Sequence, residues 1–229
     1  MGYLLEGFYS ALQMIVSLDR QMLSIAFISI KVSTLSTMLA TLVGLPTGFY
    51  IGIKNFWGRK ALISIFNTLM SVPTVIIGLS VYFIICRRGP LGSLGLLYTP
   101  WAMVLGQAIL AFPIVASLSL SAVISLDRRV EKTALSLGAD NLQAAFFILS
   151  EGRFAILSAI IAAFGRVFGE VGASMMLGGN INGYTRNIPT AIALETGKGE
   201  FVLAIALGMI LLSVALSVNI LAGYFQHKK

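Results

Sequence analysis

Long apolar runs, separated by short segments that hold most of the charged residues, dominate the chain. Because a helix needs about 20 apolar residues to cross the hydrocarbon core of a bilayer, each run predicts a transmembrane helix. The predicted spans cover residues 26–53, 61–86, 100–125, 154–179 and 201–225. Residues 3–18 are apolar but too short and interrupted to span, so we expect an interfacial helix there. The pattern predicts an all-α membrane protein of about five transmembrane helices.

Composition agrees with this fold class. Of the 229 residues, 57% are hydrophobic and only 11% are charged, whereas about a quarter of the residues in soluble domains are charged. No repeat and no low-complexity segment interrupts the chain, so we expect a single transmembrane domain over residues 1–229. Glu6 and Asp19 replace the basic start of a cleavable signal peptide, so the first span should act as its own insertion signal.

The formal charge of +7 could in principle favour nucleic acid or lipid headgroups. Most cations lie between the apolar runs, so we read the excess as membrane topology, with the lipid bilayer and no nucleic acid as a partner. Cations are more frequent on the side that holds residues 126–153 and the C-terminus. On that side lie Lys54, Arg59, Lys60, Arg128, Arg129, Lys132, Arg153, Lys228 and Lys229, and on the other Arg20, Arg87, Arg88, Arg186 and Lys198. The bias predicts a multi-pass protein of the cytoplasmic (inner) membrane, with an outside N-terminus and a cytoplasmic C-terminus.

The chemistry-bearing residues exclude several functions. Cys86 is the only cysteine and His227 the only histidine. An intrachain disulfide is therefore excluded, and a zinc site built from Cys or His residues lacks ligands. There is no phosphate-cradling Gly-x-x-x-x-Gly-Lys-Ser/Thr motif and no catalytic pair of carboxylates. We therefore expect a chain that has no catalytic residues, binds no metal and no cofactor of its own, and is not an enzyme.

Residues 126–153 form the longest hydrophilic segment, far longer than the usual connection of about 4–6 residues. The apolar spacing predicts a helix over residues 127–137, which ends at Gly138. Asp140 or Asn141 can cap a second helix over residues 143–149. Two short helices at a glycine corner would present a compact knob to a partner. The alternative is a positively charged loop that only sets topology.

This segment resembles the cytoplasmic loop of permease subunits in binding-protein-dependent ABC importers. The family pattern is Glu-Ala-Ala, three residues, Gly, nine residues, Ile, one residue, Leu-Pro, and Ala134, Gly138 and Ile148 match it. The departures are Lys132 in place of Glu, with Glu131 one place earlier, Thr133 in place of the first Ala, and Ser150-Glu151 in place of Leu-Pro.

The resemblance implies a type I ABC importer permease fold, with loop 126–153 seated in a groove of a separate ATPase subunit. It also implies a homodimer with two ATPase subunits that bind ATP-Mg, and an extracytoplasmic binding protein. The residues to which it assigns the docking contacts are Arg128, Arg129, Glu131, Lys132, Thr133, Ala134, Leu137, Gly138, Ala139 and Asp140.

Arg166 and Glu170 are the ionisable pair of the fourth predicted span. Four residues apart on a helix, they share a face and can neutralise each other. Ionisable groups at membrane depth are costly unless paired, so they point to a bundle interior or a pathway. Either a structural ion pair at a subunit interface or a contact that lines a gate fits the pattern.

A glycine-rich turn follows this span. Its backbone donors, with Asn180, Thr185 and Arg186, would suit a tetrahedral oxyanion at an outer mouth. Lys31 lies near the outer end of the first span, where it either snorkels to the headgroups or adds positive potential to an anion entry path.

The residues around this turn carry a second resemblance. Phe168–Ala173, Gly179-Asn180 and Thr185-Arg186 are similar to the corresponding part of oxyanion permeases for molybdate, sulfate and tungstate. The runs Glu131–Ala134 and Thr190–Phe201 look closest to the tungstate branch. The resemblance implies an oxyanion cargo, with tungstate as the first choice.

Two other classes compete with this interpretation. A secondary transporter or channel for an anion would need no ATPase, but such folds often show internal repeats and broken spans, which the sequence does not reveal. An intramembrane enzyme would need buried nucleophiles or metal ligands, and Glu170 is the only acid deep in a predicted span. Pro46 and Pro73 either serve packing or bend their spans.

Overall fold

The structure, a computed structural model, describes residues 2–126, 133, 134 and 136–227. These residues form helices and connecting turns, with no strand among them. The helices are α1 (Gly2–Val16), α2 (Arg20–Ile53), α3 (Arg59–Met70), α4 (Thr74–Ile85), η1 (Gly92–Leu94), α5 (Pro100–Ser125), α7 (Asn141–Glu151), α8 (Arg153–Phe168), α9 (Gly172–Gly178), α10 (Ile188–Lys198) and α11 (Phe201–His227). The predicted all-α class is confirmed.

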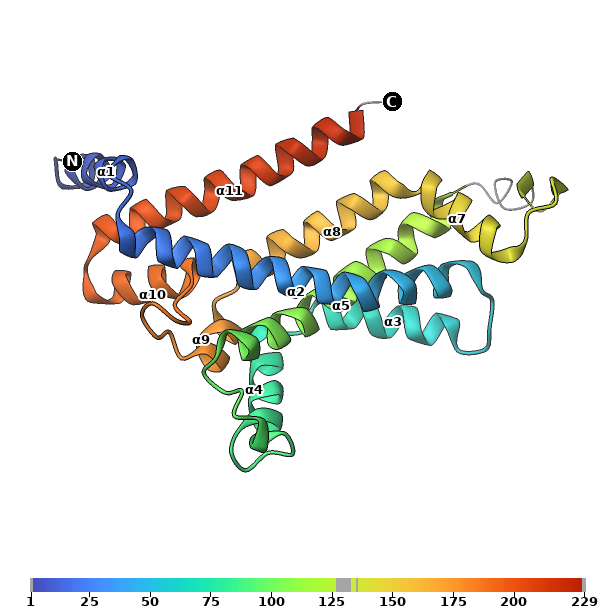
Figure 1. Cartoon of the computed structure of the whole chain (residues 1–229), viewed down its shortest axis with the longest axis horizontal. Helices are drawn as coiled ribbons and strands as arrows, with labels where there is room; N and C mark the ends of the chain where they lie inside the picture. Colours follow the sequence, from blue (N-terminus) through green and yellow to red (C-terminus); the bar gives the residue numbers. More distant parts are fainter. Residues whose placement is uncertain (1, 127–132, 135, 228–229) are drawn as a thin grey trace.

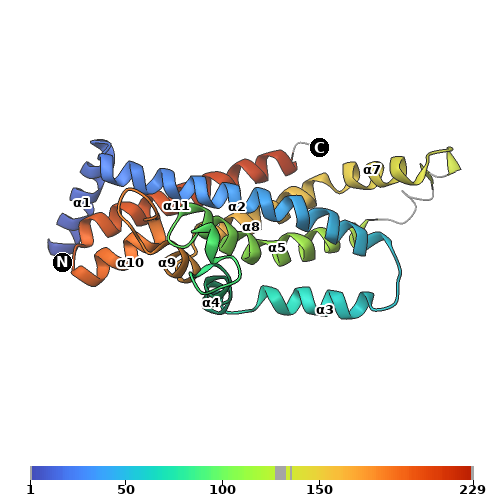
Figure 2. The same ribbon diagram turned by 60° about the horizontal axis from the view of Figure 1, so that its bottom comes forward.

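Four long helices, α2, α5, α8 and α11, run along the length of the molecule (Figures 1 and 2). Helix α5 is at the centre, since 56% of its most apolar stretch is buried, against 17% for α11. Three described helices, α2, α5 and α11, are long and apolar enough to cross a membrane, or five spans result if each of two bent pairs counts as one.

Helices α2 and α5 make the most extensive contact of the bundle. Gly44, Gly48 and Gly52 recur every fourth residue of α2, and all three lie against α5. A Cβ at Gly48 would overlap the carbonyl oxygen of Ala116. The absent side chains therefore let the two backbones approach closely, as small residues commonly do between membrane helices.

The predicted second span is wrong as a continuous helix. Helices α3 and α4 meet at 98°, and α4 projects from the bundle (Figure 1). Pro73 lies at the corner and caps α4. Proline lacks a backbone donor and disfavours helical geometry at the preceding residue, so the bend falls there. Pro46, in contrast, lies inside the uninterrupted helix α2.

The predicted fourth span is also interrupted. Helix α8 ends at Phe168 and α9 begins at Gly172, which leaves residues 169–171 as a gap, here called the α8–α9 break. The 16 residues of α8 measure about 24 Å at 1.5 Å per residue. The predicted third and fifth spans match α5 and α11 closely, whereas the first span begins six residues earlier than predicted. There the Asp19 carboxylate accepts a hydrogen bond of 2.9 Å from the Met22 amide.

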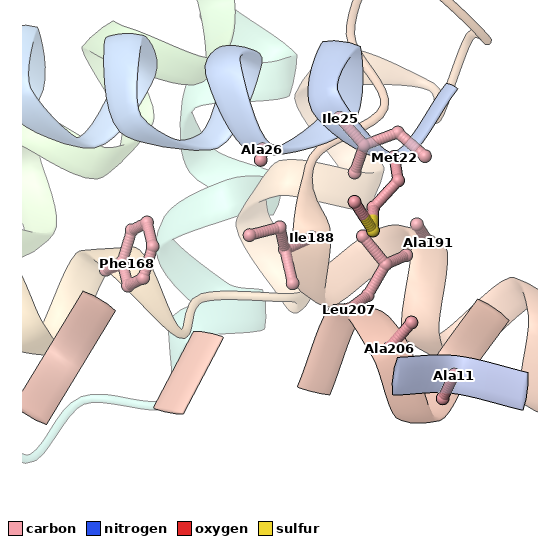
Figure 3. Packing of buried hydrophobic residues seen from close by; sticks show 9 residues of the cluster. All are labelled: Ala11, Met22, Ile25, Ala26, Phe168, Ile188, Ala191, Ala206 and Leu207. Atoms are coloured by element: carbon pink, nitrogen blue, oxygen red, sulfur yellow. The ribbon is translucent and has the colours of Figure 1, made fainter. Parts of the chain in front are cut away.

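One end of the bundle is closed by a cluster that the sequence did not predict. Figure 3 shows Met22 and Ile25 of α2 packed toward Ile188 of α10 and Leu207 of α11. Ala11 of α1 belongs to the same cluster. The helix expected near residues 3–18 is thus present as α1 and packs on α11, and an additional helix, α10, fills the segment before the last span.

Candidate functional site

The α8–α9 break holds the predicted ion pair. Arg166 Nη1 lies 3.1 Å from Glu170 Oε2, and the Glu170 side chain is 3% exposed against 45% for Arg166. The predicted contact is confirmed, although Glu170 lies beyond the end of α8 rather than on it. Its second oxygen, Oε1, accepts a hydrogen bond of 3.1 Å from the Ala173 amide. Glu170 therefore joins the last turn of α8 to the first turn of α9.

The two interrupted regions of the chain meet at this point. A Cβ at Gly172, the first residue of α9, would lie 3.2 Å from Thr74 Oγ1 and 3.1 Å from Val75 Cγ2 at the start of α4. Further along, a Cβ at Gly78 would lie 3.0 Å from Ala173 Cα. Helices α4 and α9 therefore begin side by side and pack through residues without bulk.

Residues 179–187, which the sequence predicts to lie at an outer mouth and which we call the outer turn, are held by internal contacts. The Thr185 hydroxyl is fully buried, donates to the Gly178 carbonyl at 2.5 Å and accepts from the Ile181 amide at 2.9 Å. Asn180 adopts φ +52°, and its side-chain amide donates to the Thr190 carbonyl at 3.4 Å. In this conformation, the Thr185 hydroxyl is engaged within the turn.

Arg186 is directed toward a carboxylate that the sequence analysis had not proposed as a site residue. Its Nη1 lies 3.8 Å from Glu195 Oε1, and the two side chains are only 13% and 7% exposed. Lys198 Nζ lies 3.1 Å from the same oxygen. The Glu195 carboxylate therefore has two basic neighbours, Arg186 and Lys198, and the cluster carries a net positive charge. Arg186 Nε and Asn180 Oδ1 are buried without a hydrogen-bond partner among the described residues.

Lys31 lies apart from both of these clusters. Its side chain is exposed on α2, and we find no hydrogen bond or ion pair to it in the described part of the chain. Its neighbours Ile30 and Thr34 line a groove of about 800 Å³ between α2, α8 and α11. The structure thus places Lys31 beside a largely apolar groove, and does not bring it to Arg166 or Arg186.

A buried polar network was missed by sequence reasoning. The Gln107 amide nitrogen donates to Ser174 Oγ at 2.9 Å, and its oxygen accepts from Ser36 Oγ at 3.3 Å. The three side chains are almost fully buried, and they join α2, α5 and α9. An amide inside an apolar run was the available signal, because such a group needs partners away from water.

Loop 126–153 is described from residue 133 onward, except for residue 135. Gly138 has φ +88°, a left-handed conformation that suits a glycine at a helix end. Asp140 Oδ1 accepts from the Gln143 amide at 2.7 Å, and Gln143 Oε1 accepts from the Asp140 amide at 3.0 Å. The predicted turn at Gly138 and the cap at Asp140 are confirmed, and the second helix, α7, extends beyond residues 143–149 at both ends. Most of the helix predicted over residues 127–137 lies outside the described residues.

The described part of the loop carries an apolar depression. Its volume is about 610 Å³. Ala134 is buried whereas Leu137 is 84% exposed. The lining residues are Thr133, Ala134, Leu137, Gly138, Ala139, Gln143 and Phe147. The remaining predicted docking residues, Arg128, Arg129, Glu131 and Lys132, lie outside the described residues.

Solved structures with the same fold are transporter subunits. The inward-facing MetNI methionine ABC transporter matches with a TM-score of 0.71 and 16% identity, over 87% of this chain and 92% of that one. A bacterial ABC transporter involved in the import of alginate matches with a TM-score of 0.75 and 20% identity, over 95% and 84% of the two chains. The fold is that of a type I ABC importer permease.

Sequence relatives define the family. Residues 44–229 match the family described as binding-protein-dependent transport system inner membrane component. The tungstate uptake system permease protein TupB of Peptoclostridium acidaminophilum is 41% identical over 228 residues and the full length of both chains. TupB of Campylobacter jejuni is 38% identical over all of this chain and 94% of that one. A probable anion ABC transporter permease protein of Haloferax volcanii is 39% identical over 90% and 91%. The chain belongs to this family of ABC importer permeases.

Proposed function

We propose that this permease forms the translocation pathway for a tetrahedral oxyanion, with tungstate as the preferred cargo. The supporting observation is the 41% identity to a tungstate uptake permease along the whole chain. The pathway would be assembled from two copies of the chain, driven by two ATPase subunits that bind ATP-Mg and supplied by an extracytoplasmic binding protein. Broken helices, which the sequence did not reveal, are present, but family membership favours the importer over a secondary transporter.

Loop 126–153 is proposed to dock on the ATPase. Helix α7 ends at Glu151 and α8 begins at Arg153, so only Gly152 separates α7 from the bundle helix α8. The two helices meet at 67°, and α8 leads directly to the Arg166–Glu170 pair. Movement of α7 with an ATPase would be transmitted to the α8–α9 break through one continuous helix.

The proposed topology places loop 126–153 and the C-terminus in the cytoplasm and the N-terminus outside. Figure 1 supports this assignment, because α1 and α7 lie at opposite ends of the long axis. The outer turn lies at the same end as α10, far from α7 (Figures 1 and 2). Asn180, Thr185, Arg186 and Lys31 would then lie toward the side from which the anion arrives.

The docking proposal is tested with Gly138→Glu in the complex with its ATPase. Gly138 and Gly58 both have positive φ, at +88° and +89°, and a Cβ at either would meet nothing within 4 Å. Gly58→Glu is therefore a matched control for strain and charge, placed outside loop 126–153 at the start of α3. We expect Gly138→Glu to abolish transport-coupled ATPase activity while membrane insertion is retained, and Gly58→Glu to retain coupling. Equal coupling in both variants would refute docking at Gly138.

The cargo is tested on the partner binding protein, by competition among tungstate, molybdate and sulfate, followed by uptake into proteoliposomes that contain the full complex. We expect tungstate to compete most strongly and to be transported. A preference for sulfate in both measurements would refute tungstate while leaving the importer assignment intact.

A further inference from the structure

A cavity of about 550 Å³ lies at the far end of α4, where the chain turns back through η1 to α5. We call it the α4 cup. Its lining includes Tyr82, Cys86, Arg87, Arg88, Gly95 and Tyr98. Helix α4 projects from the bundle (Figure 1), and the cup shares no residue with the groove of Lys31 or with the α8–α9 break. No function discussed above uses it.

The α4 cup carries uncompensated positive charge. Arg87 and Arg88 are exposed, and neither makes an ion pair within the described part of the chain. The sequence has no acidic residue between Asp19 and Asp127, so no carboxylate lies on the neighbouring turns. Glu170 lies beside the opposite end of α4, which its 12 residues place about 18 Å away. The cup therefore presents two guanidinium groups that have no carboxylate partner among the described residues.

Tyr98, which also lines the cup, has a constrained backbone. Tyr98 adopts φ +61°, a conformation that is unusual for a bulky residue and that persists only when its surroundings hold it. Its amide donates to the Leu177 carbonyl at 2.9 Å, and its ring is so close to Gly179 that a Cβ there would lie 2.8 Å from it. The side chains of Tyr82 and Tyr98 line the same cavity as the two arginines.

Gly92, in the turn that closes the cup, has no room for a side chain. A Cβ at Gly92 would lie 2.5 Å from the Cys86 carbonyl oxygen and 2.7 Å from that of Arg87. Gly95 has φ +58°. Because Gly92 lets the backbone of this turn lie against the end of α4, the Cα positions of Arg87 and Arg88 are set at the rim, and their side chains are exposed.

We propose that the α4 cup binds a phosphate-like oxyanion, with Arg87 and Arg88 as the charged donors and the hydroxyls of Tyr82 and Tyr98 as neutral donors. Guanidinium groups pair with tetrahedral oxyanions through strong, often bidentate hydrogen bonds. The ligand is either a free dianion or the phosphate of an anionic lipid headgroup. The free-dianion source rests on the proposed function, whereas the headgroup source does not.

The experiment uses the full chain purified in detergent, with Arg87→Gln/Arg88→Gln as the test variant. Lys54→Gln/Lys60→Gln changes the charge equally near the α2–α3 connection and is the control. Sodium tungstate binding is measured by titration calorimetry. Retention of phosphatidylglycerol against phosphatidylcholine is measured by native mass spectrometry. Tyr98→Phe keeps the ring against Gly179 and removes only the hydroxyl, so it measures the contribution of the hydroxyl to binding.

We expect the double arginine variant to bind one of the two ligands at least tenfold more weakly, and Tyr98→Phe to bind the same ligand about threefold more weakly. The lysine control should bind both ligands with unchanged affinity. Loss of tungstate binding identifies the free dianion, and loss of phosphatidylglycerol alone identifies the headgroup. If the arginine and lysine variants bind both ligands equally, the site is refuted. That outcome would not change the coupled ATPase activity expected in the Gly138→Glu comparison. The anion site and the proposed function can therefore be refuted separately.

Discussion

Gly48 is the position at which the structure predicts the clearest effect of a single methyl group. A Cβ there would overlap the Ala116 carbonyl oxygen and lie 3.0 Å from the Leu120 amide nitrogen. Both atoms belong to the backbone of α5, so no side-chain rotation can relieve the contact. Gly48→Ala must therefore push α2 and α5 apart along the most extensive helix contact of the bundle.

The expected cost follows from two opposing terms. Overpacking of a tight interface typically costs about 1–3 kcal/mol, whereas alanine is favoured over glycine inside a helix by roughly 0.5–1 kcal/mol. The middle of the two ranges leaves a net loss of about 1 kcal/mol. For a chain of this size, 1 kcal/mol shifts the midpoint of unfolding by about 2–4 °C, so the midpoint should fall by about that amount.

The assay is thermal unfolding of the purified protein in detergent, followed by size-exclusion chromatography of the remaining folded fraction. Gly208→Ala in α11 is the matched control, because a Cβ there meets nothing within 4 Å. It should leave the midpoint unchanged or raise it slightly. A Gly48→Ala protein as stable as the Gly208→Ala protein would refute the close α2–α5 approach.

Three further substitutions address the buried polar groups. Glu170→Gln keeps an acceptor for the Ala173 amide but removes the charge that faces Arg166, so we expect a folded protein with impaired uptake in proteoliposomes; normal uptake would exclude a role for the charge. Gln107→Leu removes the partner of Ser174, while Ser36 keeps its hydrogen bond to the Val32 carbonyl; it should cost about 1–3 kcal/mol in thermal unfolding, and an unchanged midpoint would contradict the network. Glu195→Gln should speed hydrogen exchange in the outer turn, and unaltered exchange would show that the carboxylate does not hold it.

Apolar run length determined how much of the bundle could be predicted. Helices α5 and α11 match their predicted spans because polar or helix-breaking residues bound both runs. The second span contained a visible signal, Pro73, but its 98° bend depends on the contact of α4 with α9. That contact involves Gly78 and Ala173, nearly a hundred residues apart, and no local pattern encodes it.

In the candidate site, too, some contacts could be predicted from the sequence and others could not. The Arg166–Glu170 contact followed from a spacing of four, even though the helix ends between the two residues, because the break keeps Glu170 near the last turn. Arg186 was expected to face an arriving anion, yet it lies 3.8 Å from Glu195. A long-range pairing of this kind follows only from the fold of α10 onto the outer turn. Likewise, the Thr185 hydroxyl could not be recognised from sequence as one that is buried in its own turn.

The meeting of the two breaks has a mechanical consequence for the proposed transport cycle. Helix α9 is joined to α8 through Glu170 and to α5 through the hydrogen bond between Ser174 and Gln107, 2.9 Å long. It is packed against α4 where a Cβ at Gly78 would lie only 3.0 Å from Ala173 Cα. Close-packed contacts of this kind transmit displacement, because they cannot be compressed without overlap. A shift of α8 driven from α7 would therefore move α9 and α4 together, so a gate at this depth would involve both interrupted helices rather than the Arg166–Glu170 pair alone.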